Sequence, residues 1–355
     1  MAKILIKNGR IWDGSRFFYA DVLTDAEKVA RIEPHITEKA DYVYDATGKT
    51  VSAGLVDMHV HMRVTPTDEY GIQAEMSCFP FGVTAAADAG RVQGERIVMD
   101  SFMLKNLVFV SADIRKNRVD FDEVERAIDR FGDKTVGIKV YFDTVLNGVS
   151  DLSSLREVCD FAKKRGLRVM VHCSNSPVPM AEVLSVLNVG DILTHAFHGG
   201  ENHAAQDGFE SMREAQARGV IIDTGFAGYV HTDFAVLRQA MENGIRPNTI
   251  STDITKRSAY VRGGRYGMTM CMSMARQVGM SEEMIFKAVT SAPAAALGKA
   301  GEWGCLRIGG AADLAVLADV DEVFSLTDTA GNCLEGEKSY RCVLTISDGQ
   351  IVYRD

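Results

Sequence analysis

The alternation of hydrophobic and polar positions divides the chain into three stretches. Residues 3–53 alternate in the manner of β-strands, as in KILIKNGRIW. The C-terminal end shows the same alternation in DLAVLADV and RCVLTISDGQIVYRD, whereas the middle does not. Because the termini of a domain tend to lie close together, we expect both ends of the chain to form one small β domain.

The middle of the chain carries near-continuous apolar runs separated by helix-like segments. Eight such runs occur, at residues 54–62, 83–90, 107–114, 135–142, 167–174, 190–197, 219–225 and 248–255. Runs of this kind are typical of strands buried on both faces of a parallel sheet. Amphipathic helix patterns follow several of them, at residues 121–131, 152–166 and 208–219. Eight strand–helix units within roughly 250 residues predict a (β/α)₈ TIM barrel.

The pattern therefore predicts two domains. Residues 54–304 form the barrel, and residues 1–53 plus 305–355 form a small β-sandwich domain. Within the small domain, Asn8-Gly9 and Asp348-Gly349 predict hairpin turns.

Composition narrows the possible partners. A net charge of −9 with few basic runs argues against nucleic acid or an anionic membrane, so a small-molecule substrate is expected. The chain has no signal-peptide layout and no apolar run near the ~20 residues of a membrane span. Seven cysteines without a CxxC pair favour reduced thiols and a cytoplasmic location. Whether the chain forms a homo-oligomer is left open.

Polar residues stand near the C-terminal ends of the predicted strands. They are His59, His61, Lys139, His172, His195 and Asp253. In a barrel these strand ends converge on the face where active sites lie. Since residues two apart in a strand point the same way, His59 and His61 should both face the mouth of the barrel.

A metal centre explains this concentration of buried polar groups. Singly, each residue has a simpler explanation, such as a structural histidine, a lysine that reaches solvent, or an aspartate N-cap. Together, four histidines and a carboxylate suit Zn²⁺ or a similar first-row ion. The ammonium of Lys139 would be repelled by such ions, unless its amine has reacted with CO₂ to form an anionic carbamate that bridges two of them.

Several motifs resemble the amidohydrolase superfamily. AGLVDMHVHM resembles its [PA]GxxDxHxH signature, and the order HxH, Lys, His, His, Asp is similar to its binuclear subtype with a carboxylated lysine. SAPAAALG and GCLRIGGAADLAVL resemble the segment in which such chains return to the β domain. VGIKV, GDILTHAF and TISTDI are most similar to a dihydroorotase-like subgroup. Its members are labelled dihydroorotase or adenine deaminase, and some resemble deacetylases of small α-substituted carboxylic acids.

The resemblance implies a role for each ligand. His59, His61 and Asp253 would hold one divalent ion, and His172 and His195 a second. Carboxylated Lys139 and a hydroxide would bridge the two ions, and the hydroxide would attack the substrate carbonyl. Asp253 would act as general base and then as general acid. Asp57 would support the centre from below or make a structural hydrogen bond.

Six side chains are candidates for contacts with the substrate: Arg63, Arg91, Tyr141, His231, Arg262 and Arg265. Arg63 completes an HxHxR motif, which holds the substrate carboxylate in dihydroorotases; an exposed loop arginine is the alternative. His198 and His203 lie in a loop rich in glycine and asparagine, where we expect surface exposure.

The expected function is hydrolysis of an amide or ester of a small carboxylate-bearing substrate, with removal of an acyl group. The alternative is a cyclic amidase of the dihydroorotase or hydantoinase kind, or an adenine-type deaminase. Dihydroorotases carry MPN at the second strand, where this chain has TAAADAG, and this disfavours that activity. A barrel that has lost catalysis is a third hypothesis, which the full set of ligands disfavours.

Overall fold

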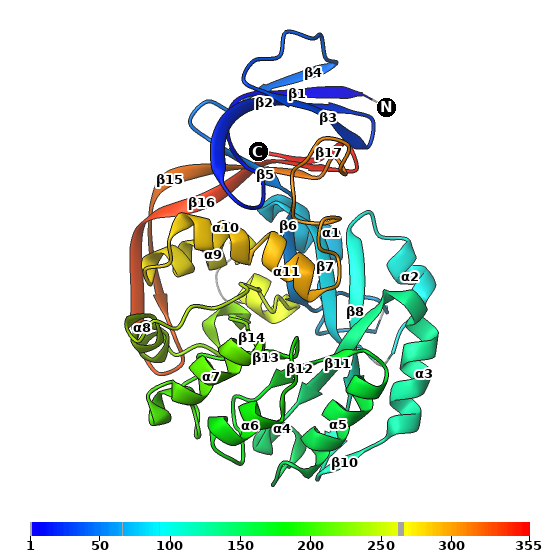
Figure 1. The fold of residues 1–355 in the computed structure, drawn as a ribbon, viewed down its shortest axis with the longest axis vertical. Helices are drawn as coiled ribbons and strands as arrows, with labels where there is room; N and C mark the ends of the chain where they lie inside the picture. Colours follow the sequence, from blue (N-terminus) through cyan, green and yellow to red (C-terminus); the bar gives the residue numbers. More distant parts are fainter. Residues whose placement is uncertain (1, 66, 92, 262–265) are drawn as a thin grey trace.

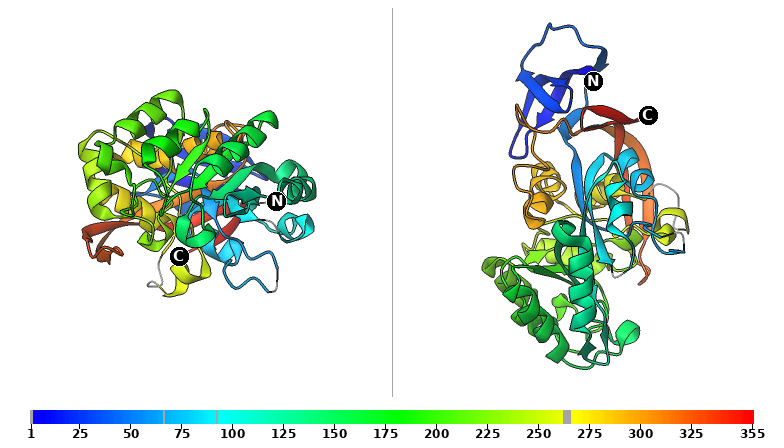
Figure 2. Two further views of the ribbon diagram at one scale, coloured as in Figure 1. Left: turned by 90° about the horizontal axis from the view of Figure 1, so that it is seen from below. Right: turned by 90° about the vertical axis from the view of Figure 1, so that its right-hand side faces the viewer.

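The computed structural model describes residues 2–65, 67–91, 93–261 and 266–355. The described residues form two large sheets, an upper and a lower one, in an elongated molecule, and β9 (Ile114–Arg115) and β10 (Arg118–Val119) pair as a small third sheet. Both termini lie beside the upper sheet (Figures 1 and 2). The chain passes from one sheet to the other at Gly54, between strands β5 (Thr50–Ala53) and β6 (Leu55–Val60). It returns to the upper sheet in β15 (Leu314–Thr327).

The upper sheet is built from both ends of the chain, as the alternation predicted. Its strand order is β17-β16-β15-β5-β1-β2-β3, with β4 beside β1. The remaining bounds are β1 (Lys3–Trp12), β2 (Phe17–Asp25), β3 (Lys28–Glu33), β4 (Tyr42–Asp45), β16 (Cys333–Ser347) and β17 (Gln350–Arg354). The two halves enclose a common core, in which Ile6 and Val22 pack with Val316 and Leu344. They are joined edge to edge through β15 and β5, so the strands of both halves form one continuous path around this core.

The two predicted hairpin turns have different outcomes. Asp348-Gly349 does connect β16 to β17, and both residues have positive φ values of 46° and 72°. Asn8-Gly9 is not a turn. It lies inside β1, where the register against β2 shifts between Ile6 and Gly9 and Asn8 has a φ of 59°. The pair forms a bulge, because Asn8 tolerates this left-handed conformation as readily in a bulge as in a turn.

The lower sheet is the wall of the predicted barrel. Seven parallel strands pair in the order β6-β7-β8-β11-β12-β13-β14. Beyond β6, their bounds are β7 (Val83–Arg91), β8 (Lys105–Ala112), β11 (Thr135–Tyr141), β12 (Arg168–His172), β13 (Ile192–Thr194) and β14 (Ile221–Ile222). Each begins within two residues of its predicted run.

The eighth predicted strand, residues 248–255, is irregular. It closes the barrel through two isolated bridges, Asp223 to Thr249 and Val60 to Ile254. Asp253 interrupts a regular ladder because its φ is 47°, in the left-handed region. The segment is nonetheless fixed to the first strand of the barrel, β6, since Asp253 N donates to His59 O at 2.7 Å.

Helices cover the outside of the barrel (Figure 2, left). They are α3 (Phe121–Phe131), α5 (Ser153–Lys164), α6 (Met180–Val186), α7 (Glu210–Arg218), α8 (Phe234–Glu242), α9 (Met268–Gln277), α10 (Glu282–Ala288) and α11 (Ser291–Ala296). Shorter elements lie in the loops: α1 (Ala74–Cys78), α2 (Arg96–Asp100), α4 (Thr144–Asn147), β9 (Ile114–Arg115) and β10 (Arg118–Val119). The predicted helices at 121–131, 152–166 and 208–219 correspond to α3, α5 and α7. None of the described helices is long and apolar enough to cross a membrane.

A long hairpin of β15 and β16 extends from the upper sheet along the side of the barrel (Figure 1). Near its tip, Asp328 Oδ2 accepts a hydrogen bond of 2.7 Å from Phe234 N, and Asn332 Nδ2 donates to Asp233 Oδ1 at 3.1 Å. The hairpin therefore caps the start of α8. The sequence predicted strands over only part of this hairpin, at 313–320 and 341–355.

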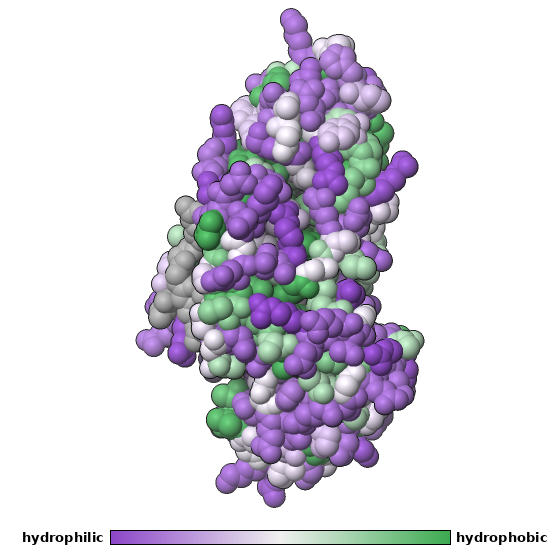
Figure 3. All heavy atoms as spheres, turned by 90° about the vertical axis from the view of Figure 1, so that its left-hand side faces the viewer, coloured by the Kyte–Doolittle hydropathy of each residue, from purple (hydrophilic) through white to green (hydrophobic). Residues whose placement is uncertain are grey.

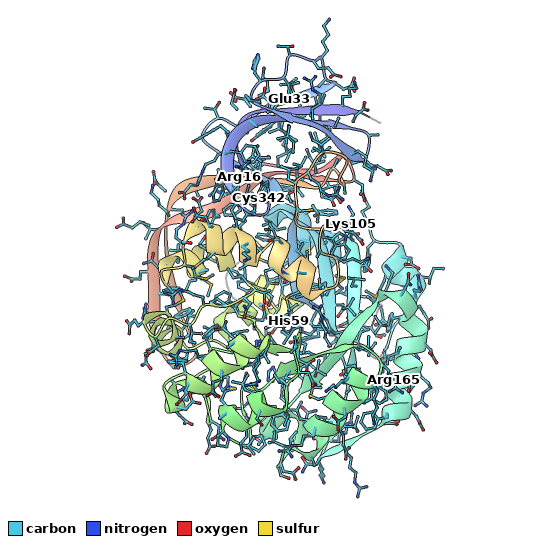
Figure 4. The ribbon with its side chains drawn as sticks, viewed as in Figure 1. Arg16, Glu33, His59, Lys105, Arg165 and Cys342 are labelled. Carbon is cyan, nitrogen blue, oxygen red and sulfur yellow. The ribbon has the colours of Figure 1, made fainter. Side chains whose placement is uncertain are left out.

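A partly buried ion-pair cluster joins the two sheets. Lys105 lies at the start of β8 (Figure 4). Its Nζ is 2.6 Å from Asp313 Oδ1 and 2.7 Å from Asp348 Oδ1. Burial is the largest influence on Asp313 and raises its pKa, although Lys105 opposes the shift.

On the surface, hydrophilic side chains predominate, and hydrophobic ones gather near the middle of the face in Figure 3.

We predict that Lys105→Met lowers the free energy of unfolding by about 1–3 kcal/mol at neutral pH, because Asp313 is then left buried without its cation. The loss should shrink as the pH falls, because protonation of Asp313 removes the unpaired charge. Urea denaturation at several pH values measures both effects. The matched control is Lys338→Met, whose partner Asp321 is 91% exposed in the side chain and whose loss should change little. Equal stability of the two variants would contradict the prediction.

Candidate metal centre

A cavity of about 250 Å³ opens at the C-terminal ends of the barrel strands. All six predicted ligands line it: His59, His61, Lys139, His172, His195 and Asp253. Each of these side chains is buried, and His59 and Lys139 are completely so. The structure thus brings together residues that are up to 194 positions apart in the sequence, from His59 to Asp253.

The first group of potential ligands comprises His59, His61 and Asp253. Their ligating atoms all lie within 4.8 Å of one another. His61 Nε2 is 2.8 Å and His59 Nε2 is 3.2 Å from Asp253 Oδ1. Even so, Asp253 Oδ1 is buried without a hydrogen bond from any described residue. Lone pairs that converge in this way at close range fit a shared cation better than they fit one another.

The second group comprises His172, His195 and His231. Their ligating atoms also lie within 4.8 Å of one another. The His172 and His195 rings meet edge to face with centroids 4.7 Å apart. The sequence predicted the first two as metal ligands, and His231 only as a substrate contact.

Lys139 lies in β11, close to the first group. Its Nζ is 3.0 Å from His59 Nε2, and no described carboxylate lies within ion-pair distance of it. Burial lowers the pKa of Lys139 to about 8, although the charge of Asp253 opposes this shift. A completely buried lysine without an acidic partner is costly, and its amine is partly neutral near pH 7.

Outer hydrogen bonds fix the orientation of the imidazoles. Thr194 Oγ1 donates to Asp223 Oδ2 at 2.8 Å, so it can only accept from His59 Nδ1, which lies 3.0 Å away. His195 Nδ1 donates to Gly225 O at 2.6 Å. In both rings Nε2 is left with a lone pair, the form in which imidazole binds a metal.

Two buried aspartates support the centre from behind. Asp223 accepts hydrogen bonds from Thr194, Thr249 and Ser251 at 2.6–2.8 Å. Asp57 Oδ2 accepts from Thr252 Oγ1 at 2.6 Å, and its pKa is raised to about 7 by burial. A supporting position for Asp57 was expected, but that of Asp223 was missed. Its place at the end of the seventh apolar run, in IIDTG, could have indicated it.

Burial lowers the pKa of His59, His172, His195 and His231. Burial, followed by the positive charge of Lys139, lowers the pKa of His59 to about 3. Burial, followed by His172, lowers the pKa of His231 to about 4. Burial would raise the pKa of Asp253, but the neighbouring His59 and His61 hold it well below its ordinary value. The centre therefore offers neutral imidazoles and a carboxylate at neutral pH.

The backbone is bent where two of these side chains enter the cavity. His195 has a φ of 57° and Asp253 a φ of 47°, a conformation that costs non-glycine residues about 1–3 kcal/mol. Gly225 is required beside them. A Cβ at this position would overlap Thr194 Oγ1 and lie 2.6 Å from His195 Nδ1.

Only two of the six predicted substrate contacts are among the described residues that line the cavity. Tyr141 and His231 line the cavity. Arg63 is exposed and does not line it. Arg91 does not line it either, because its guanidinium bonds to Asp68, Asp88 and the carbonyl oxygen of Met62. Arg262 and Arg265 lie outside the described residues.

The sequence missed Arg257, which does line the cavity and is exposed. Apolar side chains lie near it, with Tyr70, Leu146 and Val230 also lining the opening. Its position four residues after Asp253 could have drawn attention to it.

His198 was expected at the surface, and this prediction was wrong. It is only 2% exposed, with Nε2 3.9 Å from Cys173 Sγ, because the loop after β13 folds inward behind His172.

The fold and this centre define a class of protein. The model of the amidohydrolase family matches residues 50–352, and the chain belongs to this family. A protein of Enterococcus faecalis named deacetylase is 29% identical over 98% of this chain and 98% of its own length. A crystal structure described as an adenine deaminase is 27% identical, with a TM-score of 0.87 over 99% of both chains. One described as a dihydroorotase is 23% identical, has a TM-score of 0.89 over the whole of both chains, and shows the shared fold.

We predict that Gly225→Ala destabilises the protein by more than the ~1 kcal/mol of backbone strain alone, because its Cβ must displace Thr194 or His195. Gly208→Ala is the matched control: its φ is +65°, and nothing lies within 4 Å of the added Cβ. Thermal unfolding compares the two. Equal losses would show that the close approach at Gly225 imposes no constraint on His195.

Proposed function

We propose that this chain is a binuclear metal-dependent hydrolase that removes an acyl group from a small carboxylate-bearing amide or ester. The observation that carries the proposal is the convergence of two ligand groups around buried Lys139 at the base of one cavity. The deacetylase name of the Enterococcus faecalis relative favours deacylation over the other activities found in the family. All seven cysteines are free thiols in the structure. We propose a cytoplasmic location, where thiols stay reduced.

The residues present suit two divalent ions, and we propose Zn²⁺. His59, His61 and Asp253 would hold one ion, and His172 and His195 the other. Imidazole nitrogens with a carboxylate oxygen are ligands that zinc favours. When bound, a pair of such ions activates water for attack and polarises the substrate carbonyl.

Lys139 would link the two groups as a carbamate. Its amine has a pKa of about 8, lower than that of an exposed lysine, so a minor neutral fraction exists near pH 7. The neutral nitrogen attacks CO₂, forms an N–C bond and releases a proton, which leaves an anionic carboxylate at the end of the side chain. This change removes the ammonium that burial disfavours and supplies oxygens between the two groups of ligands.

Asp253 would transfer the proton. Its Oδ1 lies 2.8 Å from His61 Nε2 at the wall of the cavity, where the attacking water and the substrate would bind. The pKa of Asp253 lies well below its ordinary value, so the group is a carboxylate at neutral pH and can accept the proton of the water. It then delivers that proton to the leaving nitrogen or oxygen.

Arg257 would bind the carboxylate of the substrate. Among the described residues that line the cavity, it supplies the only guanidinium. A guanidinium can hold a carboxylate through two parallel hydrogen bonds. The apolar side chains of Leu146 and Val230 on the same opening suit a substrate that also carries a hydrophobic group. Tyr141, also in the wall, would contact the substrate close to Lys139.

The test is hydrolysis by the zinc-loaded protein of two sets of compounds. The first set contains N-acetyl and O-acetyl derivatives of α-substituted carboxylic acids of both hands. The second contains dihydroorotate, hydantoins and adenine, because the cyclic amidases and deaminases are the alternative. We expect cleavage of the first set, with Asp253→Asn losing turnover by about 10²–10⁴-fold. Cleavage of rings alone would overturn deacylation, and near-normal turnover by Asp253→Asn would exclude the proton transfer.

For an acetylated acid that is cleaved, we predict that Arg257→Met raises KM by about 10–100-fold, the value of one charged hydrogen bond, with kcat less affected. The matching substrate with a carboxamide in place of its carboxylate should be equally poor for both proteins. Lys256→Met is the control variant, since Lys256 is adjacent and exposed but does not line the cavity. An unchanged KM in Arg257→Met would assign carboxylate binding to another residue.

A further inference from the structure

His231 is a third imidazole beside the two proposed ligands of the second ion. Its ring centroid lies 4.5 Å from that of His195 and 4.9 Å from that of His172. The centroids of His172 and His195 are 4.7 Å apart, so the three rings form a nearly equilateral triangle. A residue that served only to contact substrate would have no need to approach both ligands equally.

The outer contacts of these rings follow one pattern. In His172, Nε2 lies 3.3 Å from Asp143 Oδ2; in His195, Nδ1 bonds to the carbonyl of Gly225. In His231, Nδ1 lies 3.1 Å from Ser174 Oγ. Each ring therefore has one nitrogen engaged by an oxygen partner and the other left for the cavity. This is the arrangement that orients histidine ligands of metals in proteins.

The backbone around His231 is held from both sides. Ala227 N donates to Thr252 O at 2.9 Å, beside Asp253. Two residues after His231, Asp233 N donates to Phe197 O at 2.9 Å, and the Asp233 side chain caps α8. Asn332 at the tip of the β15–β16 hairpin bonds the same carboxylate. His231 is thus placed by the segments that also carry Asp253 and His195.

We propose that His231 is a ligand of the second ion, which would complete a trihistidine site with His172 and His195. Three protein ligands with one further position open is the ligand set of catalytic zinc. The second ion would then be held by neutral nitrogens of the chain even when Lys139 is not carboxylated. The inference rests on the metal binding of the proposed function but not on the identity of its substrate.

The test measures metal binding rather than activity. The metal-free protein and its His231→Gln variant are titrated with Co²⁺ against a chromophoric chelator, and the shifted ring N–H signals of ligated histidines are recorded by proton NMR. We expect the variant to bind the second ion at least ~10-fold more weakly and to lose one shifted signal, with the first ion unaffected. His198→Gln is the control, since His198 is also a buried histidine near His172 but is not a proposed ligand.

Retention of every shifted signal and of both affinities in His231→Gln would overturn the proposal and return His231 to a substrate contact. If that variant does not fold, Ser174→Ala replaces it, because it removes only the partner of His231 Nδ1. This variant should bind the second ion several-fold more weakly while all shifted signals are kept. An unchanged affinity for the second ion would contradict the proposal. Binding of only one ion by the unaltered protein would instead contradict the binuclear centre of the proposed function.

Discussion

The structure depends on the burial of several imidazoles, an amine and a carboxylate at one end of an apolar barrel. Moving each of these groups out of water costs free energy unless a partner inside the protein compensates the loss of hydration. Asp253 Oδ1 shows that compensation within the described protein is incomplete, since it lies 2.8 Å from His61 Nε2 without accepting a hydrogen bond. Lys139 shows the same, because it is completely buried and no carboxylate of the described residues is in ion-pair contact with it. Divalent ions satisfy the nitrogens and the carboxylate together, and a carbamate removes the positive charge from the lysine.

The surrounding fold keeps these groups from relaxing away from one another. Asp223 collects three hydroxyl donors behind the centre, and one of them, Thr194, sets the tautomer of His59. The eighth segment of the barrel is irregular at the point where it delivers Asp253, so a strained backbone coincides with the acid that we assign to proton transfer. The β15–β16 hairpin reaches down from the upper sheet to fix Asp233, two residues from His231. Segments far from the cavity thereby restrain the movement of the residues that line it.

The sequence predicted the barrel and its six proposed ligands because both depend on local patterns. Buried parallel strands are apolar throughout, and a polar residue at the end of such a strand stands out. The eighth strand was wrong in detail because a run such as NTISTDIT does not reveal that Asp253 adopts a left-handed conformation. Arg91 was a reasonable candidate by position, but Asp68, which engages it, lies 23 residues away in the chain. Arg257 and the burial of His198 depend on how loops fold over the barrel, which periodicity does not encode.

The binuclear centre is tested most directly by X-ray diffraction from crystals of the zinc-loaded protein, recorded on both sides of the zinc absorption edge. We expect two anomalous peaks in the cavity. One should lie among His59, His61 and Asp253, the other beside His172 and His195, with density extending from Lys139 between them. A cavity without anomalous density, and with a bare Lys139 amine, would contradict the binuclear centre. The polar side chains at the mouth of the barrel would then need an explanation other than metal binding.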